Sequence, residues 1–164
     1  MGLESFSSTD GSAMRLPEVP TTLMGWGRSP VSTGLVVSPT SAPEVSAAIV
    51  SDGPSAERGV IARGLGRAYG DPAQRAGGRV VDMRFVRDID VSSDGVVTAG
   101  AGASLDDLLD VMVPRGWFVP VTPGTRRVTL GGMIAADVHG KNHHKVGSFG
   151  SHVRWIDVRL ADGS

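Results

Sequence analysis

The chain has 164 residues, enough for one domain with a hydrophobic core, and an ordinary globular composition apart from 23 glycines. Its formal net charge of −1 gives no reason to expect attraction to nucleic acid or to an acidic membrane surface, and the absence of cysteine excludes disulfides, thiolate metal sites and a cysteine nucleophile. No apolar run reaches the length of a membrane span, and residues 1–10 lack a signal-peptide pattern, which favours the cytoplasm.

The N-terminal part is predicted to contain a tail, a loop and a strand. Residues 1–20 are rich in Ser, Gly and Pro, which is typical of a disordered tail. Residues 23–30 place Trp26 between two glycines and indicate a structured loop. Residues 35–37 are a short candidate strand.

A helix is predicted next, because capping residues precede an apolar pattern. Thr40 or Ser41 can cap it, Pro43 suits its first turn, and Glu44 favours the positive end of the helix dipole. The residues expected to face the core are Val45, Ala48 and Ile49.

A strand-like run at residues 59–62 leads directly into a glycine-rich loop. Glycine clusters indicate a tight turn or a close approach of backbone to a ligand, and amides freed by such a turn bind anions well. The loop therefore predicts a phosphate-bearing ligand; its glycines and arginines are Arg63, Gly64, Gly66, Arg67 and Gly70.

Two strands and a second helix are predicted in the middle of the chain. Residues 79–83 and 95–103 are rich in β-branched residues. Ser104 is a candidate N-cap with Asp107 three residues later, and Pro114 ends the helix. Its apolar stripe is Leu105, Leu108, Leu109 and Met112.

The C-terminal part is predicted to contain two more strands, at residues 117–121 and 153–160, around a second glycine-rich segment at 123–150. Residues 161–164 are a turn signal, and a strand ending in Asp-Gly usually leads into a hairpin partner. We therefore expect a C-terminally truncated chain. The mixture of short strands and helices predicts an α+β or mixed α/β class.

The second glycine-rich segment predicts another anion site. Thr129 can cap a short helix, and the amides of a helix N-terminus bind anions. The small residues of this helix, which allow close packing against a ligand or another backbone, are Gly131, Gly132, Ala135 and Ala136. A diphosphate that bridges two loops would use both segments.

Two common phosphate motifs do not fit. The dinucleotide motif G-x-G-x-x-G, counted from Gly64, requires glycine where Tyr69 stands. The P-loop motif before Lys141 has Ala135 in place of its first glycine and Asn142 in place of Ser or Thr. The sequence therefore supports neither a Rossmann NAD site nor a nucleoside triphosphatase.

Three segments carry a specific resemblance: ARGLGRAYGD, PGTRRVTLGGMIAADVHGKNHH and GSFGSHV. Together they resemble the FAD-binding domain of the vanillyl-alcohol oxidase / p-cresol methylhydroxylase superfamily, and most of all the branch that oxidises decaprenylphosphoryl-β-D-ribose. The resemblance implies an α+β fold of p-cresol methylhydroxylase type with two small α/β subdomains. It places an incomplete FAD-binding domain at residues 21–164, after a tail at 1–20, with the substrate domain absent.

The resemblance also implies which residues contact FAD. In the first loop they are Ala62, Arg63, Gly64, Leu65, Gly66, Arg67, Ala68, Tyr69 and Gly70. In the second segment they are Gly124, Thr125, Thr129, Leu130, Gly131, Gly132, Ala136, Asp137, Val138 and His139. His139 is the catalytic candidate within this chain, beside the flavin, and the general base is expected in the missing part.

Arg67 is an informative departure from many relatives. Sugar-alcohol and aldonolactone oxidases carry a histidine there that bonds covalently to the flavin, and arginine cannot form that bond. We therefore expect non-covalent FAD, with Arg67 free to meet phosphate charge.

The resemblance implies FAD-dependent oxidation of the ribose 2-hydroxyl of the lipid-linked sugar to a ketone. This is the first half of an epimerisation that makes the arabinose donor of the cell wall. An NAD(P)H-dependent keto-reductase is the implied partner. The resemblance also allows a location at the cell-envelope face or in the periplasm instead of the cytoplasm. The alternatives are another sugar or aldonolactone oxidase of the superfamily, and an inactive FAD-binding fragment.

Other side chains have simpler interpretations. His139 and His143 have a spacing found in metal sites, but Gly140 disfavours a helix presenting both, and we expect no metal. Tyr69 is expected to pack against the ligand. The residues expected to serve only packing are Trp26, Trp117 and Trp155, and those expected on a polar helix face are Asp106, Asp107 and Asp110.

Overall fold

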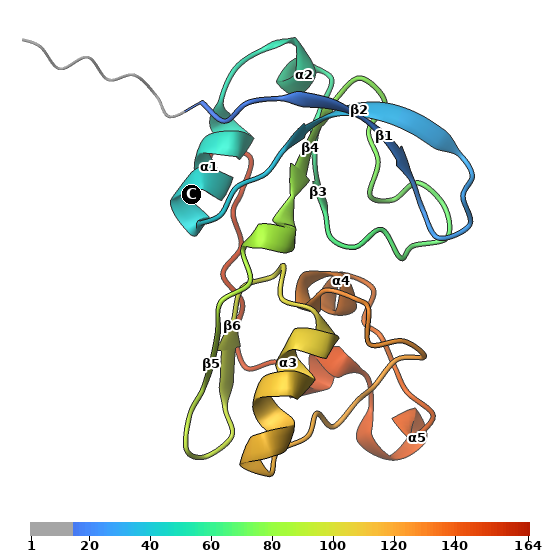
Figure 1. Cartoon of the computed structure of the whole chain (residues 1–164), viewed down its shortest axis with the longest axis vertical. Coiled ribbons are helices and arrows are strands. Elements are labelled where there is room, and N and C mark those ends of the chain that lie inside the picture. The colour runs from blue at the N-terminus through green and yellow to red at the C-terminus, as the bar shows by residue number, and fades with distance from the viewer. Residues whose placement is uncertain (1–14) are drawn as a thin grey trace, which may run out of the picture.

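The chain folds into two small units joined end to end (Figure 1), and the computed structural model describes residues 15–164. The first unit contains a four-stranded sheet in the order β1-β2-β4-β3, and the second contains a two-stranded β5-β6 sheet. The strands are β1 (Val19–Met24), β2 (Val31–Val37), β3 (Val60–Arg63), β4 (Arg79–Asp82), β5 (Ile89–Val91) and β6 (Val97–Ala99). The helices are α1 (Ala42–Val50), α2 (Pro54–Glu57), α3 (Leu105–Met112), α4 (Leu130–Ala135) and α5 (His143–Val146).

The first unit is built around β4. This strand pairs in parallel with both β2 and β3, and all four of its residues are buried. Val80 and Val81 are apolar, whereas Arg79 and Asp82 form ion pairs with Glu18 and Arg84. Helix α1 begins at the Ser41 cap, whose hydroxyl accepts a hydrogen bond from the Glu44 amide, and it buries Val45 and Ala48. The predicted helix and its core face are therefore confirmed, with Ile49 only half-buried.

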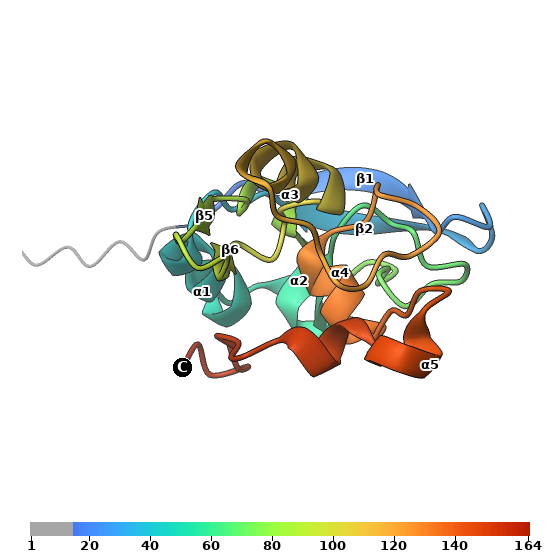
Figure 2. The same ribbon diagram turned by 90° about the horizontal axis from the view of Figure 1, so that it is seen from below.

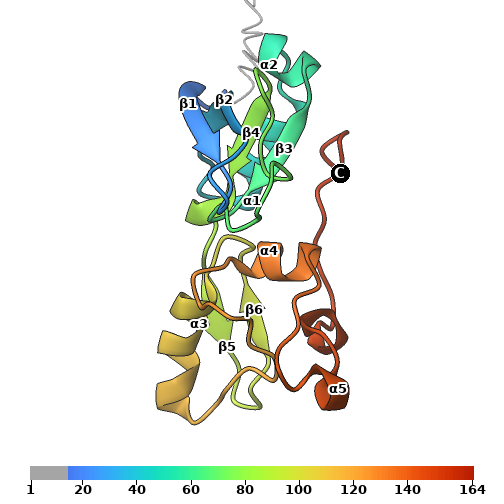
Figure 3. The ribbon, with the colours of Figure 1, turned by 90° about the vertical axis from the view of Figure 1, so that its right-hand side faces the viewer.

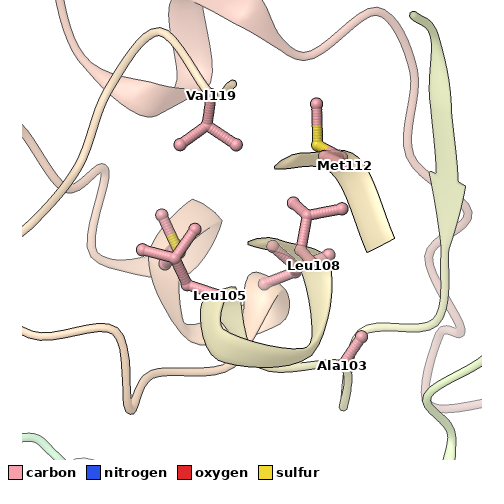
Figure 4. Packing of buried hydrophobic residues seen from close by; sticks show 7 residues of the cluster. Ala103, Leu105, Leu108, Met112 and Val119 are labelled. Carbon is pink, nitrogen blue, oxygen red and sulfur yellow. The ribbon is translucent and has the colours of Figure 1, made fainter. Parts of the chain in front are cut away.

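The second unit is built around α3. Ser104 and Asp107 form a reciprocal capping box: the Ser104 hydroxyl accepts from the Asp107 amide, and the Asp107 carboxylate accepts from the Ser104 amide at 2.9 Å. The predicted cap is thus confirmed. The apolar face of α3 packs into a core with residues that precede and follow the helix (Figure 4): Ala103, Leu105, Leu108, Met112, Val119, Leu130 and Met133.

Helix α4 lies where the two units meet (Figures 1 and 3). It begins at the predicted Thr129 cap, and its Leu130 and Met133 are buried in the core of the second unit. The segment after α5 runs back toward the first unit on the face opposite α3 (Figures 2 and 3). Helix α4 therefore lies close to the end of β3 and to the loop that follows it.

Two predicted strands are wrong. Residues 153–160 and 117–121 are extended but belong to no strand, because neither forms a ladder with another part of residues 15–164. In the second segment Pro120 also lacks the amide that a ladder needs.

The limits of two other predicted segments are also wrong. Strand β1 begins at Val19, inside the predicted tail, and extends into the predicted loop at residues 23–30. The predictions for residues 1–14 lie outside the described part of the chain. The mixed α+β class with two small units is confirmed.

Candidate functional site

A cavity of about 480 Å³ lies between the glycine loop after β3 and helix α4. The predicted residues that line it are Ala62, Arg63, Gly64, Leu65, Gly66, Arg67, Ala68, Thr129, Gly131, Gly132, Ala136 and Val138. The two glycine-rich segments, about 60 residues apart in the sequence, therefore face one another across a single space. Ala135, predicted as a small residue that allows close packing against a ligand, lines the cavity too. Sequence reasoning missed the remaining lining residues, most of them small or apolar: Pro72, Ala73, Met83, Ala101, Val128 and Met133.

The cavity lining favours an anion. It contains Arg63 and Arg67 and no carboxylate from the described residues. A larger hollow of about 930 Å³ beside α1 has the opposite character, because Asp52, Glu57 and Asp162 line it with a single arginine. Coulomb attraction therefore directs a phosphate-bearing ligand to the cavity at α4.

The two predicted amide sites differ in availability. Within residues 15–164, the amides of residues 65–70 donate no hydrogen bond to protein. The first amides of α4 are engaged: Leu130 donates to the Ala103 carbonyl at 2.8 Å, Gly131 to that of Ala101 at 2.9 Å, and Gly132 to the Thr129 hydroxyl at 3.2 Å. The prediction of a free helix N-terminus is therefore wrong, because neighbouring carbonyls and the cap already occupy it.

The two arginines of the loop also differ. Arg63 donates to the Ala73 carbonyl at 3.0 Å and to the Met24 carbonyl at 2.8 Å, and its burial lowers the pKa of its guanidinium, an effect that nearby Asp82 opposes. Arg67 makes one hydrogen bond, from Nε to the Arg127 carbonyl at 3.1 Å. Its two terminal nitrogens have no hydrogen-bonding partner among residues 15–164. Arg63 therefore shapes the loop, and Arg67 can bind a ligand.

The turn between β1 and β2 supports the glycine loop from outside. The Trp26 amide donates to the Ala68 carbonyl at 2.7 Å. A side chain at Gly25 would collide with the carbonyl oxygens of Ala68 and Gly70. At Gly66 the backbone φ is +65°, a conformation that favours glycine. These contacts hold the loop open without using its amides.

The close approach between the loop and α4 occurs at Gly64. A side chain there would collide with Thr129, the cap of α4, so glycine is required for the contact. Gly131 packs in the same way, since an added Cβ would lie 3.1 Å from the Ala101 carbonyl oxygen. At Gly132 an added Cβ would meet only the Thr129 hydroxyl, at 3.1 Å, and would otherwise face open space.

Several predicted site residues do not line the cavity. They are Tyr69, Gly70, Gly124, Thr125, Leu130, Asp137 and His139. Tyr69 is 77% exposed, whereas Leu130 is buried in the core of the second unit. The rings of His139 and His143 have centroids 5.3 Å apart, and residues 15–164 contain no group of three His, Asp or Glu side chains able to hold a metal.

None of the three tryptophans belongs to the core: Trp26, Trp117 and Trp155 are all exposed. The guanidinium of Arg67 lies over the ring of Trp26, 5.0 Å from its centroid.

Among the described residues, no helix combines the length and apolar character that crossing a bilayer requires.

Comparison with known proteins identifies the class of protein. A family model described as an FAD binding domain matches residues 33–164, and the chain belongs to this family. Two solved structures share the fold: 6-hydroxy-D-nicotine oxidase from Arthrobacter nicotinovorans (TM-score 0.67, 22% identity, 79% of this chain and 28% of that one) and cholesterol oxidase from B. sterolicum (TM-score 0.65, 18% identity, 84% and 27%). The predicted fold type is therefore confirmed.

A more specific similarity lies within this class. The chain is 50% identical over 92% of its length to decaprenylphosphoryl-beta-D-ribose oxidase from Mycolicibacterium smegmatis, and covers 34% of that protein. It is 32% identical over 79% of its length to D-lactate dehydrogenase from Archaeoglobus fulgidus, and covers 29% of it. The resemblance to the ribose-oxidase branch is confirmed, and the chain spans about a third of the length of these relatives.

The residues present fit FAD. Loop residues 65–68 line the cavity with amides that have no partner among residues 15–164, and Arg67 adds its terminal nitrogens as donors for a diphosphate. The α4 side is lined by Gly132, Ala136 and Val138, which leave room for a flat or extended group. Which residues contact the cofactor stays a prediction.

Proposed function

We propose that this chain is the FAD-binding part of an oxidoreductase that oxidises the ribose 2-hydroxyl of decaprenylphosphoryl-β-D-ribose to a ketone. The observation that carries the proposal is the 50% identity, over 92% of the chain, to the mycobacterial ribose oxidase. The identity to the archaeal D-lactate dehydrogenase is 32%, so a second flavin-dependent oxidation of a hydroxyl group is the weaker candidate. The ketone would pass to an NAD(P)H-dependent reductase that completes an epimerisation for cell-wall arabinan.

Bound FAD would supply the acceptor for the hydride that leaves the carbinol carbon. The residues of this chain would hold the cofactor and exclude water from it. The amides of residues 65–68 would donate hydrogen bonds to the diphosphate, and Arg67 would offset part of its charge. The small residues of α4 would let the remaining part of the cofactor lie close to the backbone. The binding would be non-covalent, because the linkage position carries Arg67.

Loss of the hydroxyl proton requires a general base. His139 follows the lining residue Val138 without lining the cavity itself, and we assign it a place at the edge of the flavin. We assign the base and the substrate pocket to the two thirds of the relatives' length that this chain does not cover. On this proposal the chain alone binds FAD and does not turn over the sugar.

A segment exchange tests the proposal. Residues 1–164 replace the matching segment of the mycobacterial ribose oxidase, and flavin content and dye reduction with the lipid-linked ribose are measured. We expect an active, yellow chimera. The matched control places the same residues in the archaeal D-lactate dehydrogenase, with lactate as substrate. Activity in the control alone would favour the second candidate, and a colourless protein in both would refute FAD binding.

A further inference from the structure

Trp26 is an exposed aromatic residue whose backbone is held by contacts with the glycine loop. It is 57% exposed, so burial does not account for it. Its backbone is fastened to the glycine loop by the bond from its amide to the Ala68 carbonyl at 2.7 Å. On its other side, a Cβ at Gly27 would lie 2.7 Å from the Tyr69 carbonyl oxygen. The backbone that carries the indole is therefore fixed beside the loop.

The side chain that Trp26 meets is Arg67. The guanidinium carbon lies 5.0 Å from the Trp26 ring centroid, within the range of a cation–π interaction. Its Nε donates to the Arg127 carbonyl in the segment that leads to α4. The guanidinium is thus held at one face and at one nitrogen. Both contacts leave its two terminal nitrogens without a partner among residues 15–164.

We propose that Trp26 is a positioning residue, which holds Arg67 so that its terminal nitrogens bind the diphosphate of the cofactor together with the amides of residues 65–68, which line the cavity. This inference rests on the proposed FAD site. An arginine that is already oriented loses less rotamer freedom when it binds phosphate, so affinity rises without another contact to the ligand. An aromatic face suits the task because, unlike a carboxylate, it does not neutralise the charge or occupy the donors.

The test measures binding of inorganic pyrophosphate and of FAD to the full chain by calorimetry. The variants are Trp26→Leu, Trp26→Phe, Arg67→Met and the double variant Trp26→Leu/Arg67→Met. Trp155→Leu is the matched control, since Trp155 is 62% exposed and lies outside the cavity lining. Urea unfolding of each variant checks that the fold is retained.

We expect Trp26→Leu to weaken both ligands about three- to fivefold, the range of an exposed cation–π contact. Trp26→Phe retains part of the affinity, and Trp155→Leu retains all of it. Arg67→Met weakens binding roughly tenfold to a hundredfold, as for lost hydrogen bonds to a charged group. The double variant binds no more weakly than Arg67→Met, because Trp26 acts only through Arg67.

Three results would overturn the inference: no pyrophosphate binding by the unmodified chain, unchanged affinity in Trp26→Leu, or additive losses in the double variant. Additive losses would mean that Trp26 acts by supporting the fold. If pyrophosphate binding follows the expected pattern and FAD does not bind, the positioning role stands and the proposed function fails.

Discussion

Gly132→Val separates an effect on FAD affinity from an effect on the stability of the fold. Gly132 is in α4, its amide donates to the Thr129 hydroxyl, and it lines the cavity. An added Cβ would meet only that hydroxyl, at 3.1 Å, within a radius of 4 Å. The two methyl groups of valine would therefore extend into the space that we assign to FAD, and not into protein.

The expected magnitudes differ for folding and binding. Replacing glycine inside a helix by alanine stabilises the helix by up to about 1 kcal/mol, and valine is several tenths of a kcal/mol less favourable than alanine. The free energy of unfolding should therefore stay within about 1 kcal/mol of the unmodified value. A ligand that fills the cavity should lose about 2 kcal/mol from overpacking, which corresponds to a roughly 30-fold higher Kd. Gly132→Ala should show a smaller loss of affinity and a small gain in stability.

The assay is titration of FAD followed by quenching of flavin fluorescence, with urea unfolding of the same samples. Ala42→Val is the matched control, because Ala42 is exposed at the start of α1 and outside the cavity lining. An unchanged Kd in Gly132→Val would refute the placement of FAD beside α4. An unfolded Gly132→Val would refute the inference that a side chain there meets open space.

Two other predictions follow from the ion pair between Glu18 and Arg79 and from the linkage position. Burial raises the pKa of Glu18, but hydrogen bonds from Ser55 and from Arg79, with the charge of Arg79, outweigh it and leave the pKa below its usual value. Glu18→Gln should therefore cost about 1 kcal/mol at neutral pH, because Arg79 is only 4% exposed but Glu18 is 29% exposed, and Arg79 keeps its bonds to Ala48 and Ser51. The difference should shrink in urea unfolding at about pH 3, because the stabilisation is lost as the pH falls through the lowered pKa; a loss equal at both pH values would exclude the ion pair as its cause. Acid precipitation of the FAD complex should release the flavin into the supernatant, because Arg67 cannot link to it, and a yellow pellet would contradict this.

The sequence predicted best those features that local chemistry decides. The caps at Ser41, Ser104 and Thr129 were correct because each hydroxyl is satisfied by an amide within its own first helical turn. The strand predicted at residues 79–83 was also correct, because the adjacent β-branched residues Val80 and Val81 favour a strand.

The errors concern partners that are remote in the sequence. Residues 117–121 bury Val119 and Val121 and expose Pro120, which is the alternation of a strand, yet no other segment of residues 15–164 forms a ladder with them. Side-chain periodicity reports which face is buried and carries no information about whether a second backbone lies alongside. The ion pair between Glu18 and Arg79 has the same character, because it joins residues 61 positions apart.

Contacts between residues that are remote in the sequence also decide which groups of the site can bind a ligand. Glycine, a helix start and arginine each indicate an anion site in the sequence; both glycine-rich segments contain glycine and arginine, and the second also contains a helix start. The fold engages some of them in its own contacts: the first amides of α4 bind Thr129 and the carbonyls of residues 101 and 103, and Arg63 binds two carbonyls. The groups left available are the amides of residues 65–70 and the terminal nitrogens of Arg67. A donor contributes to ligand affinity when the folded chain leaves it unsatisfied in a place that water can leave, because a satisfied donor must first break a bond. The diphosphate site is therefore expected on the loop side of the cavity, with α4 providing space and not charge.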